Sequence, residues 1–170
     1  FTAFQPKWEA PSSFSCPLPL PRKPRMDIQT VLLNRATIHN YKPQPIPEEA
    51  LREAFEAAVC APNHRLTFPW RFTRVGQATR EKVADLNVAL KQTPDAPPLG
   101  EKALAAIQGA VLNPAEMIVP SMVRSPDAFR GREDYAAVSC ALQNFMLSLW
   151  AKGVGTKWTT GKLTQQPETY

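Results

Sequence analysis

The sequence predicts a single α+β domain, in which helices alternate with short strands. At 170 residues, the chain has the length of one domain, and its hydrophobic fraction of 44% is ordinary for a globular protein. Segments with helical periodicity are separated by short apolar runs that suit strands, and proline- or glycine-marked loops join them. We therefore expect a mixed or antiparallel central sheet flanked by helices.

The first two helices are predicted from their N-terminal signals and apolar faces. Asp27 is a suitable N-cap for a helix whose face carries Ile28, Val31, Leu32 and Arg35. The segment Tyr41–Pro47 must be extended, because its prolines disfavour helix in the residues before them. Pro47 then suits the first position of a helix over Glu48–Cys60, with glutamates at its positive end. The predicted buried stripe of this helix is Leu51, Ala54, Phe55, Ala58 and Val59.

The middle of the chain predicts two strands and two helices. Trp70–Val75 and Ala115–Val123 have the apolar character of strands, and Pro120 places the second near an edge or bulge. Thr79–Leu90 is a charged amphipathic helix and Ala103–Val111 a short one. A proline-rich loop is expected over 91–100.

A long helix is predicted over Glu133–Lys152, with Asp134 as its N-terminal cap and Gly153 as its C-cap. Its apolar residues wrap most of the circumference, so the helix should be enclosed in a core or a subunit interface. A chain of this size offers little protein to enclose it, which favours an oligomer. A strand is expected to follow over Gly155–Thr159.

The two ends of the chain depart from this regular pattern. Residues 1–25 are rich in proline and serine and lack a hydrophobic period, so we expect a disordered leader before a domain at 26–170. Two interpretations of this leader stay open: translated upstream or added sequence, or an organelle transit peptide. The first implies a cytoplasmic protein and the second organellar import. The chain stops at Tyr170 within an apparent helical turn, so we expect a C-terminal strand and tail to be missing.

Composition argues against several classes of function. The net charge is +5, but residues 1–25 carry +3 of it, and no stripe of Lys and Arg alternates with aromatics, which disfavours nucleic-acid binding. The three cysteines are widely spaced, and there are only two histidines, which argues against a disulfide frame or a metal site. No apolar run reaches about 18 residues, so we expect no membrane span.

Three polar segments are candidates for binding. The first is Arg35-Ala36-Thr37, after the first helix. The second is Ala61-Pro62-Asn63-His64-Arg65, a polar connection into a strand with Pro69-Trp70 at its start, where folds often place binding groups. The third is Gly153-Val154-Gly155-Thr156-Lys157-Trp158-Thr159-Thr160-Gly161.

In this order, the three segments resemble those of the nitroreductase family, in its small single-domain NAD(P)H-dependent branch. The resemblance covers about Met26–Tyr170. It implies an α+β homodimer that holds FMN at the subunit interface. It further implies hydride transfer from NAD(P)H through the flavin to nitroaromatics, quinones or similar flat small-molecule acceptors, by a ping-pong mechanism. The flavin carries the chemistry, so no catalytic side chain and no metal is expected.

The resemblance also assigns residues to the cofactor. Arg35, Ala36 and Thr37 match a family motif, usually Arg-Arg-Ser, that binds the FMN phosphate and flavin edge; Ala36 departs from its second Arg. Arginine supplies a planar fork of donors suited to phosphate. The alternative for Arg35 is a cation that complements the helix dipole.

In the second segment, Asn63 and His64 are implied to reach the ribityl and phosphate end, with Cys60 one turn earlier. The alternatives are that Asn63 and His64 cap the preceding helix and that Cys60 only packs. In the third segment, the residues implied to line the flavin are Trp158, Thr159, Thr160 and Gly161. A strand with a tight turn is the alternative there, and His39 is expected on a solvent face.

Two other functions stay open at this point. The chain could be a non-catalytic flavin-binding protein or an inactive fragment of the same fold, which the Ala36 departure and the missing tail favour. Within the family, flavin-dependent dehydrogenation or flavin fragmentation could replace nitro reduction. The order of the three segments favours the oxidoreductase. We expect no nucleic-acid or membrane partner.

Overall fold

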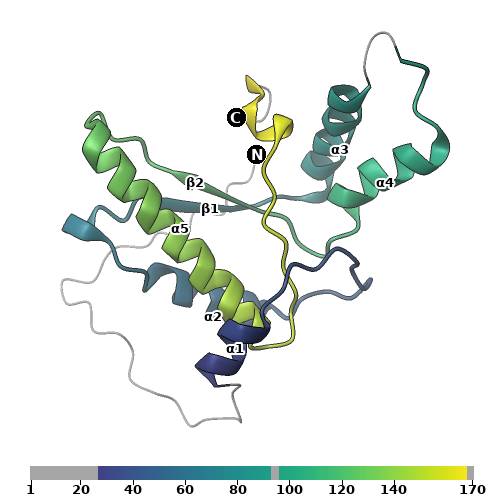
Figure 1. Cartoon of the computed structure of the whole chain (residues 1–170). Helices are drawn as coiled ribbons and strands as arrows, with labels where there is room; N and C mark the ends of the chain where they lie inside the picture. Colours follow the sequence, from purple (N-terminus) through teal and green to yellow (C-terminus); the bar gives the residue numbers. More distant parts are fainter. Residues whose placement is uncertain (1–26, 93–95, 168–170) are drawn as a thin grey trace. The chain divides into compact units, whose positions relative to one another are not determined.

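The computed structural model describes residues 27–92 and 96–167. The predicted leader, Met26 and Tyr170 lie outside the described residues. The elements are α1 (Ile28–Asn34), α2 (Glu48–Val59), η1 (His64–Leu66), β1 (Trp70–Arg74), α3 (Gln77–Lys91), α4 (Glu101–Leu112), β2 (Ile118–Met122), α5 (Ala128–Trp150) and η2 (Lys162–Gln165) (Figure 1). The mixture of helices and strands confirms the predicted α+β class.

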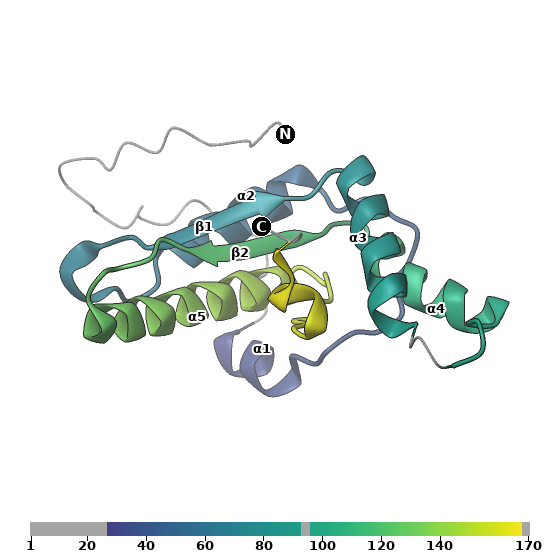
Figure 2. The same cartoon turned by 90° about the horizontal axis from the view of Figure 1, so that it is seen from above.

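The described chain forms two compact units. The first contains 27–37, 47–73 and 120–156, and the second contains 38–46, 74–119 and 157–167. Strands β1 and β2 form a two-stranded sheet and lie side by side in both views (Figure 2). The pairing is antiparallel: Val123 N–H donates to Pro69 O at 2.8 Å, and Val75 N–H donates to Met117 O at 2.9 Å. Pro120 is tolerated in β2 because a two-stranded sheet has only edge strands.

The core of the first unit lies between α2 and α5. Small side chains let the two helices approach closely, since Ala54, Ala58 and Ala141 are each fully buried. Phe55 packs against Phe72 of β1 and Phe145 of α5, with ring centroids 5.6 and 5.0 Å away, and those two rings also stack on each other. Of the predicted stripe, Leu51, Ala54 and Ala58 are buried, as expected, whereas Phe55 and Val59 are half-buried.

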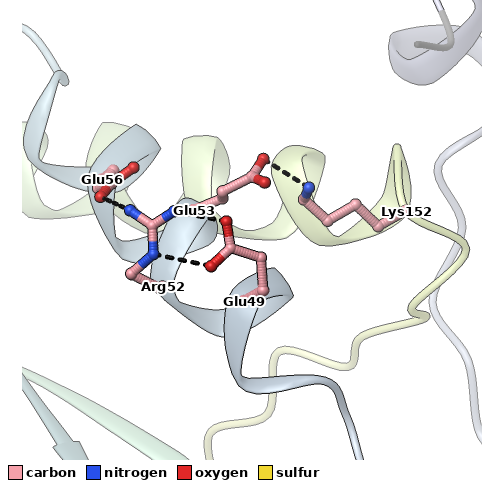
Figure 3. Close-up of polar contacts among 5 residues, drawn as sticks. All are labelled: Glu49, Arg52, Glu53, Glu56 and Lys152. Carbon is pink, nitrogen blue, oxygen red and sulfur yellow. Dashed lines mark hydrogen bonds and ion pairs between the residues drawn. The ribbon is translucent and has the colours of Figure 1, made fainter. Parts of the chain in front are cut away.

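Polar contacts also tie α2 to α5. Lys152 Nζ lies 2.5 Å from Glu53 Oε2, and Asn144 donates to Ala57 O at 3.2 Å. On the outer side of α2, Arg52 pairs with Glu49 and Glu56, as Figure 3 shows beside the Glu53–Lys152 pair. The two contacts that join the helices, Glu53–Lys152 and Asn144–Ala57, fix their antiparallel register.

The second unit is built on α3 and α4, which pack against each other. Arg80 of α3 is 7% exposed, and its guanidinium donates to Val111 O and Leu112 O, each at 2.8 Å. These carbonyls lie at the end of α4, where helical hydrogen bonds run out. The buried Arg80 guanidinium therefore caps the C-terminal end of α4.

Three sequence predictions about elements were wrong. Helix α5 starts at Ala128, because Asp127 caps it by accepting from the N–H groups of Phe129 and Arg130. Asp134 is therefore not an N-cap. Gly155–Thr159 is not a strand: only Thr156 pairs, in an isolated parallel bridge with Thr37.

The C-terminal end of α5 follows its prediction. Val154 N–H donates to Leu149 O at 3.0 Å and Gly153 N–H to Trp150 O at 2.9 Å, the pattern of a Schellman motif. Gly153 has φ +75°, a conformation that glycine adopts without strain. This turn leads the chain from α5 to Thr156.

Candidate functional site

The segment after α2 is anchored to α5 by two neighbouring carboxylates. His64 Nδ1 lies 2.8 Å from Glu133 Oε1, and the Thr67 hydroxyl donates to Asp134 Oδ1 at 2.5 Å. Asp134 is 3% exposed, whereas the His64 side chain is 63% exposed. The fold thus joins two segments that the sequence singled out separately.

The side-chain amide of Asn63 makes two hydrogen bonds within the 63–68 loop. Its Nδ2 donates to Thr67 Oγ1 at 3.0 Å, and its Oδ1 accepts from Phe68 N–H at 2.7 Å. Asn63 therefore does not cap α2, which was the alternative for this residue; it shapes the turn into β1. In this loop, the side chains of His64, Arg65 and Leu66 are exposed to solvent.

The backbone of this loop adopts an uncommon conformation. Arg65, Leu66 and Phe68 have φ values of 64°, 52° and 45°, which non-glycine residues adopt rarely. Such conformations persist only where the surroundings hold them, and they cluster at functional sites. Here, hydrogen bonds of loop residues to Glu133, Asp134 and Asn63 stabilise this conformation.

A second feature of the first unit lies where Thr37 pairs with Thr156. The Thr156 hydroxyl is buried and has no hydrogen-bond partner among the described residues. A buried hydroxyl without a partner is costly, so the site is suited to a ligand that accepts or donates there. Arg35, half-buried at the C-cap of α1, lies two residues before Thr37, and no described residue forms an ion pair with its guanidinium.

The remaining predicted residues are exposed. Ala36 is exposed between Arg35 and Thr37, and Cys60 is the C-cap residue of α2. Trp158 is 49% exposed, and Thr159, Thr160 and Gly161 continue to η2 in the second unit. Gly161 O accepts from the Thr164 hydroxyl at 2.9 Å, which forms the turn into η2.

The second unit contains a pocket of about 300 Å³ that the sequence did not reveal. It is lined by the small-residue face of α4, including Gly109, where a Cβ would lie 2.7 Å from Asn113 Nδ2. His39, Tyr41 and Lys157 also line it, and burial raises the pKa of Tyr41. His39 is exposed, as expected, but it also borders this pocket.

The pocket adjoins two of the predicted motifs in sequence. His39 follows Thr37 by two positions, and Lys157 directly precedes Trp158. Carboxylates are absent from the lining, so its polar groups can donate to an anion or to carbonyl oxygens. Only folding places α4 beside these residues, and no spacing in the sequence signals it.

Two negative findings concern the described residues. Among them, no three or more His, Cys, Asp or Glu side chains are grouped so that they could hold a metal ion. None of the described helices combines the length and apolar character needed to cross a membrane.

Comparison with known proteins identifies the family. The model of the Nitroreductase family matches residues 32–166. The chain is 27% identical over 143 residues to YfhC of Bacillus subtilis, an NAD(P)H nitroreductase by name, and this match covers 84% of the chain and 74% of YfhC. The chain belongs to the nitroreductase family.

Solved structures agree with this assignment. The nitroreductase-like family protein of Bacillus cereus superposes with a TM-score of 0.70 at 27% identity, over 86% of this chain and 76% of that one. A structure from Desulfovibrio desulfuricans, described as a nitroreductase in complex with FMN, shares the fold with a TM-score of 0.59 at 21% identity, over 83% and 72% of the two chains. The nitroreductase-like fold predicted from the sequence is confirmed.

The residues present fit FMN by the chemistry of their donors. A phosphate or ribityl oxygen would meet the buried Thr156 hydroxyl, which lacks a partner among the described residues. The Arg35 guanidinium suits a phosphate, because its donors form a planar fork. The unpartnered Thr156 hydroxyl favours a cofactor site at this position over a turn with a purely structural role.

Proposed function

We propose that this chain is an FMN-dependent oxidoreductase, which uses NAD(P)H to reduce a flat acceptor such as a nitroaromatic or a quinone. Family membership together with the orphaned Thr156 hydroxyl carries this proposal. When bound, FMN would supply the redox chemistry, taking a hydride from the nicotinamide and passing electrons to the acceptor in a ping-pong sequence.

In this proposal, the segments Arg35–Thr37 and Thr156 bind the phosphate end of the cofactor. Arg35 would donate two hydrogen bonds to phosphate oxygens, and the hydroxyls of Thr37 and Thr156 would donate further ones. Ala36 contributes only its backbone. The charge of Arg35 offsets the phosphate charge, which water would otherwise solvate.

The other predicted residues would orient the cofactor. His64 and the backbone of the 63–68 loop would contact the ribityl chain, while Asn63 contributes by shaping that loop. Cys60 would lie at the edge of the same contact surface. Trp158, Thr159, Thr160 and Gly161 would line the flavin.

The proposal includes a homodimer. Helix α1 exposes Ile28 and Leu33, at 60% and 82%, and α5 exposes Phe129 and Tyr135, at 59% and 64%. α1 packs against α5, so these side chains belong to neighbouring elements. A second copy that packs on these helices would cover these side chains. Sedimentation at several concentrations would measure the mass, and a monomer throughout would count against the dimer.

Flavin binding and reduction test the function directly. Purified protein is titrated with FMN, and its absorbance is recorded before and after addition of NADPH or NADH under nitrogen. The proposal expects a yellow protein that bleaches with a reduced nicotinamide and recovers its colour with a nitroarene or quinone. A colourless protein that takes up no FMN would contradict the proposed function, although the fold would stand. Cell fractionation checks the cytoplasmic location that we include in the proposal.

A further inference from the structure

We propose that Asp134 is a positioning residue that holds the 63–68 loop in the conformation with which it contacts the cofactor. This inference rests on the proposed function for its effect on FMN. Its structural part, the hold on the loop, can be measured without any flavin. Asp134 itself is buried in α5 and presents its carboxylate to the loop through Thr67.

The Thr67 hydroxyl lies between the Asp134 carboxyl group and the Asn63 amide. The Thr67 hydroxyl donates to Asp134 Oδ1 at 2.5 Å, so its single hydrogen is committed to that carboxyl group. Thr67 Oγ1 can then only accept from its other neighbour. Asn63 must therefore turn its Nδ2 toward Thr67, at 3.0 Å.

The planar amide of Asn63 then links Thr67 to the backbone of the loop. With Nδ2 directed at Thr67, the Asn63 Oδ1 faces the Phe68 N–H and accepts from it at 2.7 Å. Asp134 thus determines, through one hydroxyl and one amide, where the backbone at Phe68 is held. Phe68 is one of the three residues of this loop with positive φ.

The hydrogen bonds from Asp134 through Thr67 and Asn63 to Phe68 form a relay, and the exposed part of the loop lies within it. Residues 64–66, which lie between the two ends of this relay, have their side chains exposed. Without the relay, the loop would lose the restraint that offsets the cost of its left-handed residues. His64 would then keep only its exposed contact to Glu133. Asp134 acts on the cofactor through this loop and does not touch it.

The test compares Asp134→Ala, Asp134→Asn and Thr67→Val with the unaltered chain. Without flavin, trypsin cleavage after the exposed Arg65 is followed by mass spectrometry. We expect Asp134→Ala and Thr67→Val each to speed this cleavage about tenfold, because local opening becomes easier. Asp134→Asn should remain near the unaltered rate, since its amide oxygen can still accept from Thr67. Adding Thr67→Val to Asp134→Ala should change little, because both act through one hydrogen bond.

The second readout is the FMN dissociation constant, measured by quenching of flavin fluorescence. Asp134→Ala should raise it at least about fivefold, and Asp134→Asn should restore most of the affinity. Met146→Ala is the matched control, because it removes a buried side chain twelve residues further along α5 than Asp134. Asp134→Ala and Met146→Ala are compared at equal loss of melting temperature.

The outcomes separate the two proposals. Unchanged cleavage after Arg65 in Asp134→Ala overturns the inference, whatever FMN does. Equal weakening of FMN binding by Met146→Ala also overturns it, since the effect would then be general destabilisation. If the unaltered chain binds no FMN, the proposed function fails, and the cleavage rates alone decide whether Asp134 holds the loop.

Discussion

Thr156 lies opposite Thr37 in an isolated parallel bridge, and its hydroxyl is buried with no hydrogen-bond partner among the described residues. This pair joins the segment after α1 to the segment after α5, at the junction of two motifs that the sequence presents far apart. Because this hydroxyl has no structural partner in the described part of the chain, its removal should affect cofactor binding and protein stability differently.

Thr156→Val should therefore leave the stability of the flavin-free protein unchanged or raise it by about 1 kcal/mol, because a costly buried hydroxyl is removed. It should raise the FMN dissociation constant about tenfold, through loss of a hydrogen bond to a charged group. Urea unfolding and a fluorescence titration measure the two effects. A clear loss of stability without FMN would show that Thr156 already has a structural partner.

Asp127 should make α5 sensitive to acid. Backbone N–H groups of Phe129 and Arg130 hold the pKa of its carboxyl below the ordinary value. Because the folded pKa is lowered, the stabilisation is present above the unfolded pKa of about 3.9 and is lost as the pH falls through the folded value. The melting temperature of Asp127→Ala should lie below that of the unaltered protein at pH 6, and the difference should shrink towards pH 3.

Asp127→Asn serves as the control for that experiment. Its side chain still caps the helix but does not titrate, so its melting temperature should stay close to the unaltered value at pH 6. A gap between Asp127→Ala and the unaltered protein that stays constant down to pH 3 would contradict the assignment of the acid effect to this cap.

Arg80→Met should destabilise the second unit by at least about 2 kcal/mol, since several carbonyls at the end of α4 would lose their buried donor. Arg80→Lys keeps the charge but has fewer donors in a different geometry, so an intermediate loss is expected. Urea denaturation, followed by circular dichroism, compares the two. Equal stability of Arg80→Met and the unaltered chain would exclude the capping role.

The Glu53–Lys152 pair should contribute more than the Arg52 pairs on the same helix. Its two side chains are 26% and 28% exposed and join different helices, whereas Arg52 and Glu56 are each 54% exposed within α2 (Figure 3). Double-mutant cycles should give a coupling of about 1 kcal/mol for Glu53–Lys152 and a smaller coupling for Arg52–Glu56. Both should fall as salt is raised. The reverse order would show that exposure does not govern these pairs.

Much of the fold follows from local signals. The cap at Asp27, the stripe of α2 and the left-handed Gly153 were each readable, because a cap, a period of 3.6 and a glycine act over a few residues. The start of α5 was placed too late, because Asp127 was not considered as its cap. Among the motifs, Arg35, Thr37, Asn63 and His64 were found through their resemblance to a family, and their direct contact with FMN stays a prediction.

The sequence by itself determined the class of fold, most of the helices and the family, because these depend on residue type, order and short-range periodicity. Only the tertiary structure decided that Asp134 is buried beneath Thr67 and that the Thr156 hydroxyl lacks a partner among the described residues. It also decided that the small-residue face of α4 lines a pocket. Each of these depends on segments far apart in the chain, whose contact is set by helix packing and by the need to satisfy buried polar groups, which no local pattern encodes.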